Sequence, residues 1–375
     1  MNKIISSNTI AHRIFGLDLM RATAILMVVV GHCLWIVPKG EGLLFQLLEL
    51  FGFLGVEVFF VLSGFLIGKI LYQLYLTSDF NLATVFFFLK RRWYRTLPNY
   101  FLVLVLNLIL ASVIGYAALS WWQYFFFLQN FNTTMLPFFP ESWSLSVEEF
   151  AYIVLPFFLL VLGRLVAVKN RSRFFLGAVL TLILVFIGTK LYYHATTQNT
   201  TLAQWNLSLK AVVIYRLDSI FIGVLCSWIY FNFMTLWRKY KMMFVVVGVL
   251  LFFFQFFVLG SLGWVIEAKP LWWHVFYLPL LSVAVACFLP YLSEWKGSNL
   301  FWEKPIVFLS KVSYSMYLLH YSVILLLMKQ YLSYDVQDVF EVSLFVIGYF
   351  TITLVLSYLL YRFYELPMMN LRDKN

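Results

Sequence analysis

Long apolar runs recur along this chain, separated by short polar segments. A helix needs about 20 apolar residues to cross a hydrocarbon core about 30 Å thick. The pattern therefore predicts an all-α, polytopic integral membrane protein with about ten transmembrane helices. The expected spans are 17–37, 51–76, 97–117, 146–168, 174–193, 209–230, 243–262, 273–292, 306–328 and 340–361.

Composition agrees with this class of protein. Of the 375 residues, 63% are hydrophobic, 21% are aromatic and only 12% are charged, which excludes an ordinary soluble domain. We find no internal repeat, so we expect a single domain over 1–375, with a short cytoplasmic tail from about 363 and no fused soluble domain. The first span is too long for the apolar part of a signal peptide, carries Arg21 and lacks a cleavage site, so it should stay in the membrane.

Lysine and arginine are distributed unevenly along the chain, and these residues accumulate in cytoplasmic loops. If the N-terminus is cytoplasmic, only six lysine and arginine residues lie on the outer side or in the middle of a span: Lys39, Lys190, Lys210, Arg216, Lys269 and Lys329. We therefore expect a multi-pass protein of the cytoplasmic (inner) membrane, with both termini cytoplasmic and His32 toward the external face. The net charge of +10 then reflects this topology and attraction to anionic membrane lipid, and is no evidence for nucleic acid.

The first span contains two ionisable residues, Arg21 and His32, where each must offset the cost of leaving water. Eleven residues of helix turn through about 1100°, roughly 20° past three full turns, and rise about 16 Å. The two side chains therefore share one face, near opposite ends of the span. A long polar ligand with an anionic end can stretch between them, although a snorkelling arginine and a packed histidine would leave the same pattern.

A basic cluster follows the second span, in the segment KRRWYRTLP. Arg91, Arg92 and Arg95 are expected in a cytoplasmic loop beside two aromatic residues, with Pro98 early in the third span. One interpretation is an ordinary positive-inside cluster. Arginine also binds phosphate oxygens bidentately, and aromatic rings can stack on a base, so a di- or polyphosphate ligand is the other interpretation.

Two adjacent carboxylates stand near the start of the fourth span, in PESWSLSVEEFAY. Ser146 and Glu149 have the spacing of a capping box, so we expect Glu149 to cap that helix. Glu148 is not needed for the cap and is expected at the external level of His32. A carboxylate there can orient and charge-stabilise an imidazole that acts as a base. Favourable interaction with the helix N-terminus is the competing explanation for Glu148.

Polar residues also form a stripe on the ninth span, where Tyr314, Tyr317 and His320 recur at three-residue intervals. Such a stripe faces other helices or a cavity, although His320 can equally be structural and hydrogen-bonded to a tyrosine. On the sixth span, Arg216 and Asp218 are two residues apart and do not face one another. We expect each of them to pair with another helix or with a ligand.

Small residues suggest packing rather than chemistry. Gly64 and Gly68 on the second span have the spacing of a close helix crossing. The three cysteines, Cys33, Cys226 and Cys287, are scattered, with no spacing typical of a disulfide framework or a metal site. We expect the cysteines to pack in the core and the protein to need no metal.

Taken in order, these segments resemble the membrane acyltransferase family 3, whose members acylate exported glycans, lipids and some secondary metabolites. The resemblance runs the length of the chain. It is carried by LDLMRATAILMVVVGH, FLGVEVFFVLSGFLIG, RRWYR, SWSLSVEEFAY, YRLDSIFIG and SYSMYLLH. One departure is Ala151, where the family usually has an aromatic residue before Tyr152.

The resemblance implies a ten-helix core, an acyl-CoA donor substrate that enters from the cytoplasm, with acetyl-CoA the expected one, and an essential His32. It implies further that Arg21 and the cluster of Arg91, Arg92 and Arg95 bind the donor, and that Glu148 is a site residue. Because we expect no fused esterase-like domain, acceptor handling falls to this core or to a separate periplasmic partner. Candidate substrate-binding residues in the matching segments are Ser63, Trp143, Arg216, Asp218, Tyr314 and His320.

These inferences combine into one mechanism. The gap of about 16 Å between Arg21 and His32 is comparable with the pantetheine arm of coenzyme A, so the phosphates would bind the arginines and the thioester would lie near His32. The neutral imidazole would take the proton of an acceptor hydroxyl, with Glu148 stabilising the imidazolium. A covalent acyl-imidazole relay is the alternative. The expected acceptor is an extracytoplasmic glycan or a lipid-linked acceptor.

The competing class is a transporter or flippase of lipid-linked glycans. It would share the many spans and the basic cytoplasmic loops, but it would move its substrate without cleaving a thioester. The ordered set of motifs favours the acyltransferase, because a transporter has no reason to carry it. A non-catalytic assembly subunit is a third alternative, and it requires the ionisable residues to be structural pairs only.

Overall fold

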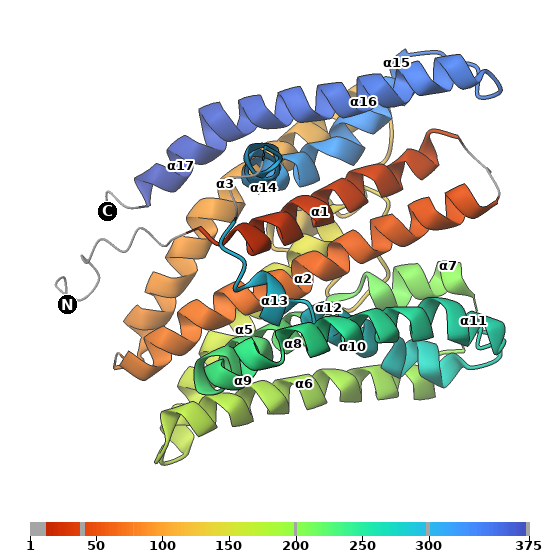
Figure 1. The fold of residues 1–375 in the computed structure, drawn as a ribbon. Helices are drawn as coiled ribbons and strands as arrows, with labels where there is room; N and C mark the ends of the chain where they lie inside the picture. The colour runs from red at the N-terminus through yellow and green to blue at the C-terminus, as the bar shows by residue number, and fades with distance from the viewer. Residues whose placement is uncertain (1–12, 38–41, 78, 199–200, 298–300, 373–375) are drawn as a thin grey trace.

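The computed structural model describes residues 13–37, 42–77, 79–198, 201–297 and 301–372. Within these ranges the chain is helical and has no strand. Nine of the described helices are long and apolar enough to cross a membrane, and most of them lie side by side along one common direction (Figure 1). The predicted all-α, multi-pass membrane fold is confirmed.

The helices that make up the spans are continuous or extended by short segments. The longest parts are α1 (Phe15–Gly31), α2 (Leu43–Thr77), α3 (Leu82–Ile114), α5 (Ser142–Leu165), α6 (Arg171–Thr196), α10 (Lys241–Phe253), α12 (Tyr277–Ala286), α14 (Glu303–Leu319) and α16 (Val339–Leu360). The extensions are η1 (His32–Trp35), η4 (Phe254–Val258), α11 (Leu259–Ser261), η5 (Trp272–Phe276), α13 (Leu289–Leu292), η6 (His320–Leu325), α15 (Leu326–Tyr331), η7 (Tyr361–Glu365) and α17 (Leu366–Leu371). The remaining helices are α4 (Trp122–Phe125), α7 (Leu202–Trp205), η2 (Asn206–Lys210), η3 (Val213–Tyr215), α8 (Leu217–Asn232) and α9 (Met234–Lys239).

The start predicted for the third span, 97–117, is wrong. The helix begins much earlier, where the side chain of Asn81 caps α3 by accepting a hydrogen bond from a first-turn backbone N–H (3.1 Å). The expected cytoplasmic loop is therefore helical, and Pro98 lies inside the helix. Membrane helices tolerate an internal proline, and the turn before Pro98 is joined to α14 by Tyr314 Oη, which donates to the Thr96 carbonyl (2.8 Å).

Two other expected boundaries differ from the structure. The sixth span, expected at 209–230, is an α-helix only over the 16 residues of α8, and η2, η3 and short turns precede it. The last span, expected at 340–361, continues through η7 and α17 to Leu371. Nine full-length spans and one shorter apolar helix therefore stand in the described chain where ten spans were expected.

Burial separates inner helices from outer ones. In the span that contains α14, 67% of the most apolar 18-residue stretch is buried. The corresponding share is 17% in the spans of α10 and α16. Val246, Leu250 and Phe253 on α10 are each more than half exposed, at 55%, 59% and 54%. In a bilayer such faces contact lipid. The span of α14 is therefore the most enclosed of these, and the spans of α10 and α16 lie at the outside of the bundle.

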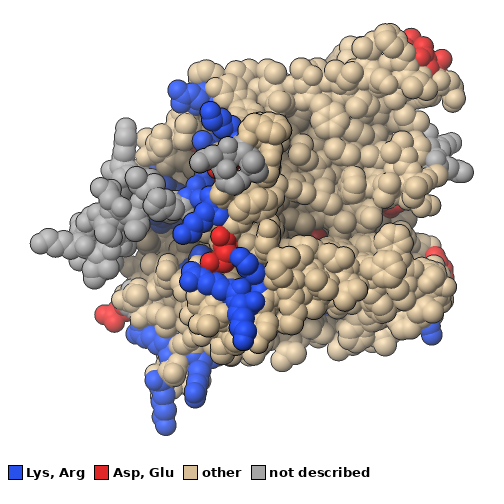
Figure 2. Space-filling view, viewed as in Figure 1, with Lys and Arg blue, Asp and Glu red and all other residues tan. Residues whose placement is uncertain are grey.

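Charged residues gather at one end of the molecule. Figure 2 shows Lys and Arg side chains at the end where α1 begins and α17 ends, and few charges over the broad middle of the same face. We call this the basic end, and we call the opposite end, which carries η1, the His32 end. The topology expected from the sequence would place the basic end in the cytoplasm.

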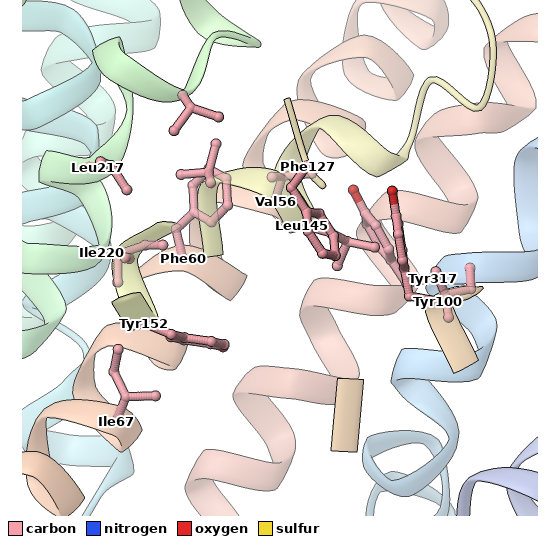
Figure 3. Packing of buried hydrophobic residues seen from close by; sticks show 14 of the residues in the cluster. Val56, Phe60, Ile67, Tyr100, Phe127, Leu145, Tyr152, Leu217, Ile220 and Tyr317 are labelled. Carbon is pink, nitrogen blue, oxygen red and sulfur yellow. The ribbon is translucent and has the colours of Figure 1, made fainter. Parts of the chain in front are cut away.

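The α2 and α8 helices cross at very short distance. A Cβ atom added to Gly64 would overlap the carbonyl oxygen of Ile220, and one added to Gly68 would overlap the hydroxyl of Ser227. The close packing predicted at the two glycines is confirmed. Figure 3 shows Phe60 and Ile220 among the buried side chains beside this crossing.

We expect Gly64→Leu to destabilise the fold, because the new side chain has no space against the backbone of α8. Overpacking of a close-packed interior costs about 1–3 kcal/mol, occasionally more. The measurement is the thermal unfolding of the purified protein in detergent. Gly177→Leu on α6 is the matched control, because nothing lies within 4 Å of a Cβ added there. Wild-type stability of the Gly64 variant would contradict the crossing.

Candidate active site

The contact between α1 and α2 fixes the relative heights of Arg21 and His32. A Cβ atom added to Gly31 would overlap the backbone of Gly52, so His32 lies level with this part of α2. Ser63 follows Gly52 by eleven residues, or about 16 Å along the helix. Because Arg21 is equally far from His32 along α1, Arg21 and Ser63 lie at one level, nearer the basic end.

A cavity lies among α1, α2, α3, α5 and α14. Val56, Phe60 and Leu145 form part of its apolar wall, and Figure 3 shows Val56 close to Leu145. The polar residues that line the cavity are Arg21, Ser63, Arg92, Arg95, Thr96, Ser144, Glu148, Tyr152, Ser313, Tyr314 and Tyr317. Residues that the sequence singled out on five different spans thus meet at one site.

Two of the three clustered arginines face this cavity. Arg92 and Arg95 are three residues apart on α3, so they share one side of the helix, and both line the cavity with Arg21. Arg91 is absent from the lining, and its guanidinium carbon lies 5.7 Å from the ring centroid of Phe87. The cationic part of the cavity is therefore Arg21, Arg92 and Arg95.

Two of these arginines have no carboxylate at ion-pair distance in the described chain. Asp18 pairs with Arg13, and its Oδ1 is 4.0 Å from Nη1 of Arg21. Among the residues that the structure describes, neither Arg92 nor Arg95 has a carboxylate within 4.0 Å. Unpaired guanidinium groups that line a cavity meet the requirement for binding a polyanion such as a diphosphate.

The predicted position of Glu148 is wrong, because this carboxylate lies at the level of the arginines and not beside His32. Its Oε2 accepts a hydrogen bond from Tyr152 Oη (3.0 Å), which also pairs with Ser63 Oγ (2.8 Å). Ser63 is about 16 Å along α2 from the His32 level, so Glu148 does not orient the imidazole in this structure. The reason is that α5 starts at Ser142, which places Glu148 about 9 Å inside the helix.

The prediction that Glu149 caps the fourth span is also wrong. Ser146 and Glu149 both lie inside α5. The Glu149 carboxylate instead accepts hydrogen bonds from Thr96 Oγ1 (2.8 Å) and Trp93 Nε1 (3.1 Å). These contacts join α5 to the turn of α3 that carries the cavity arginines.

His32 lies beside His320, at the far side of the site from the arginines. Nε2 of His320 is 3.3 Å from Nδ1 of His32, and the two rings meet nearly edge-on with centroids 4.6 Å apart. His320 is fully buried, whereas His32 is partly exposed. The pair therefore has one member in the core and one that a ligand can reach.

Backbone carbonyls define the protonation of this pair. His32 Nδ1 is 2.8 Å from the Val28 carbonyl oxygen, and His320 Nδ1 is 2.8 Å from that of Tyr317. A carbonyl oxygen only accepts, so each Nδ1 of the neutral rings carries the hydrogen. His320 Nε2 then accepts from His32 Nδ1–H. Nε2 of His32 is left without a proton, which is the state that a general base requires.

Tyr317 lies between the cavity and the histidine pair. It lines the cavity, and its ring centroid is 5.8 Å from that of His320. Its hydroxyl pairs with Ser144 Oγ (2.6 Å) and donates to the Glu141 carbonyl (3.0 Å). The Glu141 carboxylate accepts from the backbone N–H (3.0 Å) and hydroxyl (2.5 Å) of Ser322. The cavity thus reaches Tyr317, which contacts His320, but neither His32 nor His320 lines it.

Arg216 and Asp218 form buried ion pairs and do not line the cavity. Arg216 pairs with Glu57 on α2, and Asp218 with Lys190 on α6 (2.5 Å). Ser282 on α12 also donates to Glu57. Of the two roles expected for these residues, pairing with another helix is the one that the structure shows. Removing one partner would leave an uncompensated buried charge.

The other candidate substrate-binding residues divide between the cavity and its surroundings. Ser63 and Tyr314 line the cavity. Trp143 does not, and its ring packs edge-on against Phe60 with centroids 5.8 Å apart. No three His, Cys, Asp or Glu side chains gather as a possible metal site in the described part of the chain.

Several polar residues that shape the site were not predicted from the sequence. Tyr152, Thr96 and Ser144 line the cavity, and Glu141 binds the helix that carries His320. Each lies in one of the two segments KRRWYRTLP and PESWSLSVEEFAY. Each of them is a polar side chain in apolar surroundings. In a membrane helix this pattern indicates an interior position, but it does not identify the residue that the side chain contacts.

The fold and the cavity define a multi-pass membrane protein with a cationic internal site and a separate histidine pair that is connected to it through Tyr317. Residues 14–362 match the family model described as an acyltransferase domain. The chain therefore belongs to this acyltransferase family, as the ordered motifs indicated.

The curated relatives include O-acetyltransferases from Staphylococcus aureus. The O-acetyltransferase OatA of strain NCTC 8325 is 25% identical over 386 residues, which cover 94% of this chain and 57% of the relative. The SACOL0978 protein of strain COL is 26% identical over 384 residues, with 94% and 56% covered. The chain thus spans little more than half the length of these relatives. No solved structure matches the chain.

Proposed function

We propose that this protein is an integral membrane O-acyltransferase of the cytoplasmic membrane. It would move an acyl group, with acetyl the expected one, from acyl-CoA at the basic end to a hydroxyl of a glycan or lipid-linked acceptor at the His32 end. The observation that carries the proposal is one cavity lined by three arginines at one end and by Tyr317, 5.8 Å from His320 between ring centroids, at the other. Membership of an acyltransferase family and the similarity to O-acetyltransferase OatA support it.

The donor would lie along the cavity. Its phosphates would bind Arg21, Arg92 and Arg95 through charge-assisted hydrogen bonds. The pantetheine arm would extend between the apolar wall and Ser63, and the thioester would reach the end of the cavity at Tyr317. If both termini are cytoplasmic, donor and acceptor approach from opposite faces of the membrane.

The chemistry at the far end follows from the protonation of His32. Its Nε2 would accept the proton of the acceptor hydroxyl as the oxygen attacks the thioester carbonyl. Collapse of the tetrahedral intermediate would break the C–S bond, and the imidazolium would return the proton to the sulfur. The products are an ester and free coenzyme A. His320 would hold the Nδ1–H of His32 in place throughout.

Glu148 would serve the donor end of the site. Its carboxylate lines the cavity with the arginines and is held by Tyr152. A negative charge there reduces the mutual repulsion of the guanidinium groups before the donor binds. We therefore assign Glu148 as a positioning residue for the arginines in place of the role beside His32.

Thioester cleavage distinguishes this proposal from the transporter alternative. The experiment places the purified protein in nanodiscs with radiolabelled acetyl-CoA and an extract of envelope glycans. An acyltransferase releases free coenzyme A and transfers label to the extract. Binding or movement of glycan without coenzyme A release would contradict the proposal.

The role of His320 gives a separate prediction. We expect His320→Ala to lower kcat about 10- to 100-fold, because His32 Nδ1–H would keep only the Val28 carbonyl as its partner. Acetyl-CoA affinity should be unchanged, since the arginines lie at the other end of the cavity. His320→Gln should recover part of the rate, because its amide oxygen can accept from His32. A loss of donor affinity in the alanine variant would indicate a merely structural role.

A further inference from the structure

Lys210 differs from the other cations near α8. Lys190 and Arg216 are buried and paired with Asp218 and Glu57. Lys210, at the end of η2, is only partly buried. It has no carboxylate within 4.0 Å and no hydrogen-bond acceptor among the residues that the structure describes. An ammonium group left without a partner in such surroundings is available to an anionic ligand.

The position of Lys210 places it near His32. Its Nζ lies 5.4 Å from the ring centroid of Phe53. Phe53 directly follows Gly52, whose backbone contacts Gly31, the residue before His32. Lys210 therefore stands at the end of the site where the acceptor would react, far from the arginines.

Aromatic rings flank this ammonium group on two sides. Besides the contact with Phe53, Lys210 Nζ lies 5.9 Å from the ring centroid of Trp143, and both rings are partly exposed. Tryptophan and phenylalanine faces pack against the apolar faces of sugar rings as well as against cations. The arrangement combines a surface for a sugar with a cation for an acidic substituent.

We propose that Lys210, Trp143 and Phe53 form an acceptor subsite that binds an anionic sugar residue, with Lys210 pairing with its carboxylate or phosphate. The inference rests on the proposed function and names the acceptor class. Lys210 lies outside the membrane-spanning helices, where burial and the neighbouring Arg216 lower its pKa to about 8. The ammonium form therefore predominates at neutral pH.

The test compares charged and neutral acceptors of the same shape. Short oligogalacturonates and their methyl esters are offered to the protein in phosphatidylcholine nanodiscs with acetyl-CoA, and kcat and KM are measured. For the wild type we expect kcat/KM to be at least tenfold higher for the acid. Lys210→Met should remove this preference through KM, and Lys210→Arg should keep most of it. Acetyl-CoA affinity should be the same in all variants.

Lys269→Met is the matched control, because Lys269 also lies over a tryptophan, 5.8 Å from the ring centroid of Trp264, but is exposed. It should behave as the wild type. Equal use of acid and ester by the wild type, use of neither, or an unchanged preference in Lys210→Met would overturn the subsite. An effect of Lys210→Met that appears only in phosphatidylglycerol nanodiscs would assign Lys210 to a lipid headgroup and also overturn it. A wild type that never releases coenzyme A, even with envelope glycans, would instead contradict the proposed function.

Discussion

His32→Ala is expected to abolish acyl transfer while leaving the protein folded and able to bind acetyl-CoA. The substitution removes the only base that the mechanism uses, and general-base catalysis contributes about 10²–10⁴-fold to a rate. Folding should survive, because His32 is partly exposed and follows the end of α1. The measurement is coenzyme A release in nanodiscs, with acetyl-CoA binding measured on the same preparation.

Cys33→Ala is the matched control for this variant. Cys33 is the next residue along the chain and is also partly exposed, and its thiol contacts only the Val29 carbonyl (3.8 Å) among hydrogen-bond acceptors of the described chain. It should retain full activity. Wild-type activity in a folded His32→Ala protein would remove the general-base assignment, and loss of activity in both variants would indicate damage to the end of α1.

Replacing Arg92 and Arg95 together with glutamine is expected to lower acetyl-CoA affinity at least 100-fold. A hydrogen bond to a charged group contributes about 1.5–3 kcal/mol, and each 1.4 kcal/mol is tenfold in affinity. The dissociation constant is measured by isothermal titration in detergent. Raising the salt concentration should weaken binding to the wild type more than to the double variant, because screening acts on the charges that were removed.

Arg91→Gln separates the cavity arginines from the basic cluster as a whole. Arg91 has the same charge and stands next to Arg92, but it lies over Phe87 and does not line the cavity. Its replacement should change acetyl-CoA affinity less than threefold. Equal losses for Arg91→Gln and for the double variant would mean that the cluster acts through general surface charge, and the donor site would have to be placed elsewhere.

Local patterns in the sequence were sufficient for the class of protein and for several features of the site. Apolar runs predict spans because the bilayer leaves backbone groups no partner except within a helix. The spacing of Arg21 and His32 predicts a shared helix face, because helical periodicity depends only on the number of residues between them, although only Arg21 lines the cavity. The small-residue spacing at Gly64 and Gly68 predicted a close crossing for the same reason, and the ordered motifs indicated the family.

Contacts between distant helices decided the rest. Arg92 and Arg95 lie inside α3, and Glu149 on α5 accepts hydrogen bonds from Trp93 and Thr96 on the same part of the helix, more than fifty positions away. Hydropathy shows that the segment KRRWYRTLP is polar. It does not show whether buried residues of another helix form hydrogen bonds with these polar groups, so the segment was expected to be a loop. Glu148 was misplaced because α5 begins at Ser142, before the start of the expected span.

The pairing of His32 with His320, and the absence of a described partner for Lys210, likewise exist only in the folded chain. His32 and His320 are 288 positions apart, and nothing in either segment specifies which helix it meets. The sequence by itself determined which residues are polar and on which helix face they stand. The tertiary structure decided which of them meet, because an interhelical hydrogen bond or ion pair depends on the position of both helices in space.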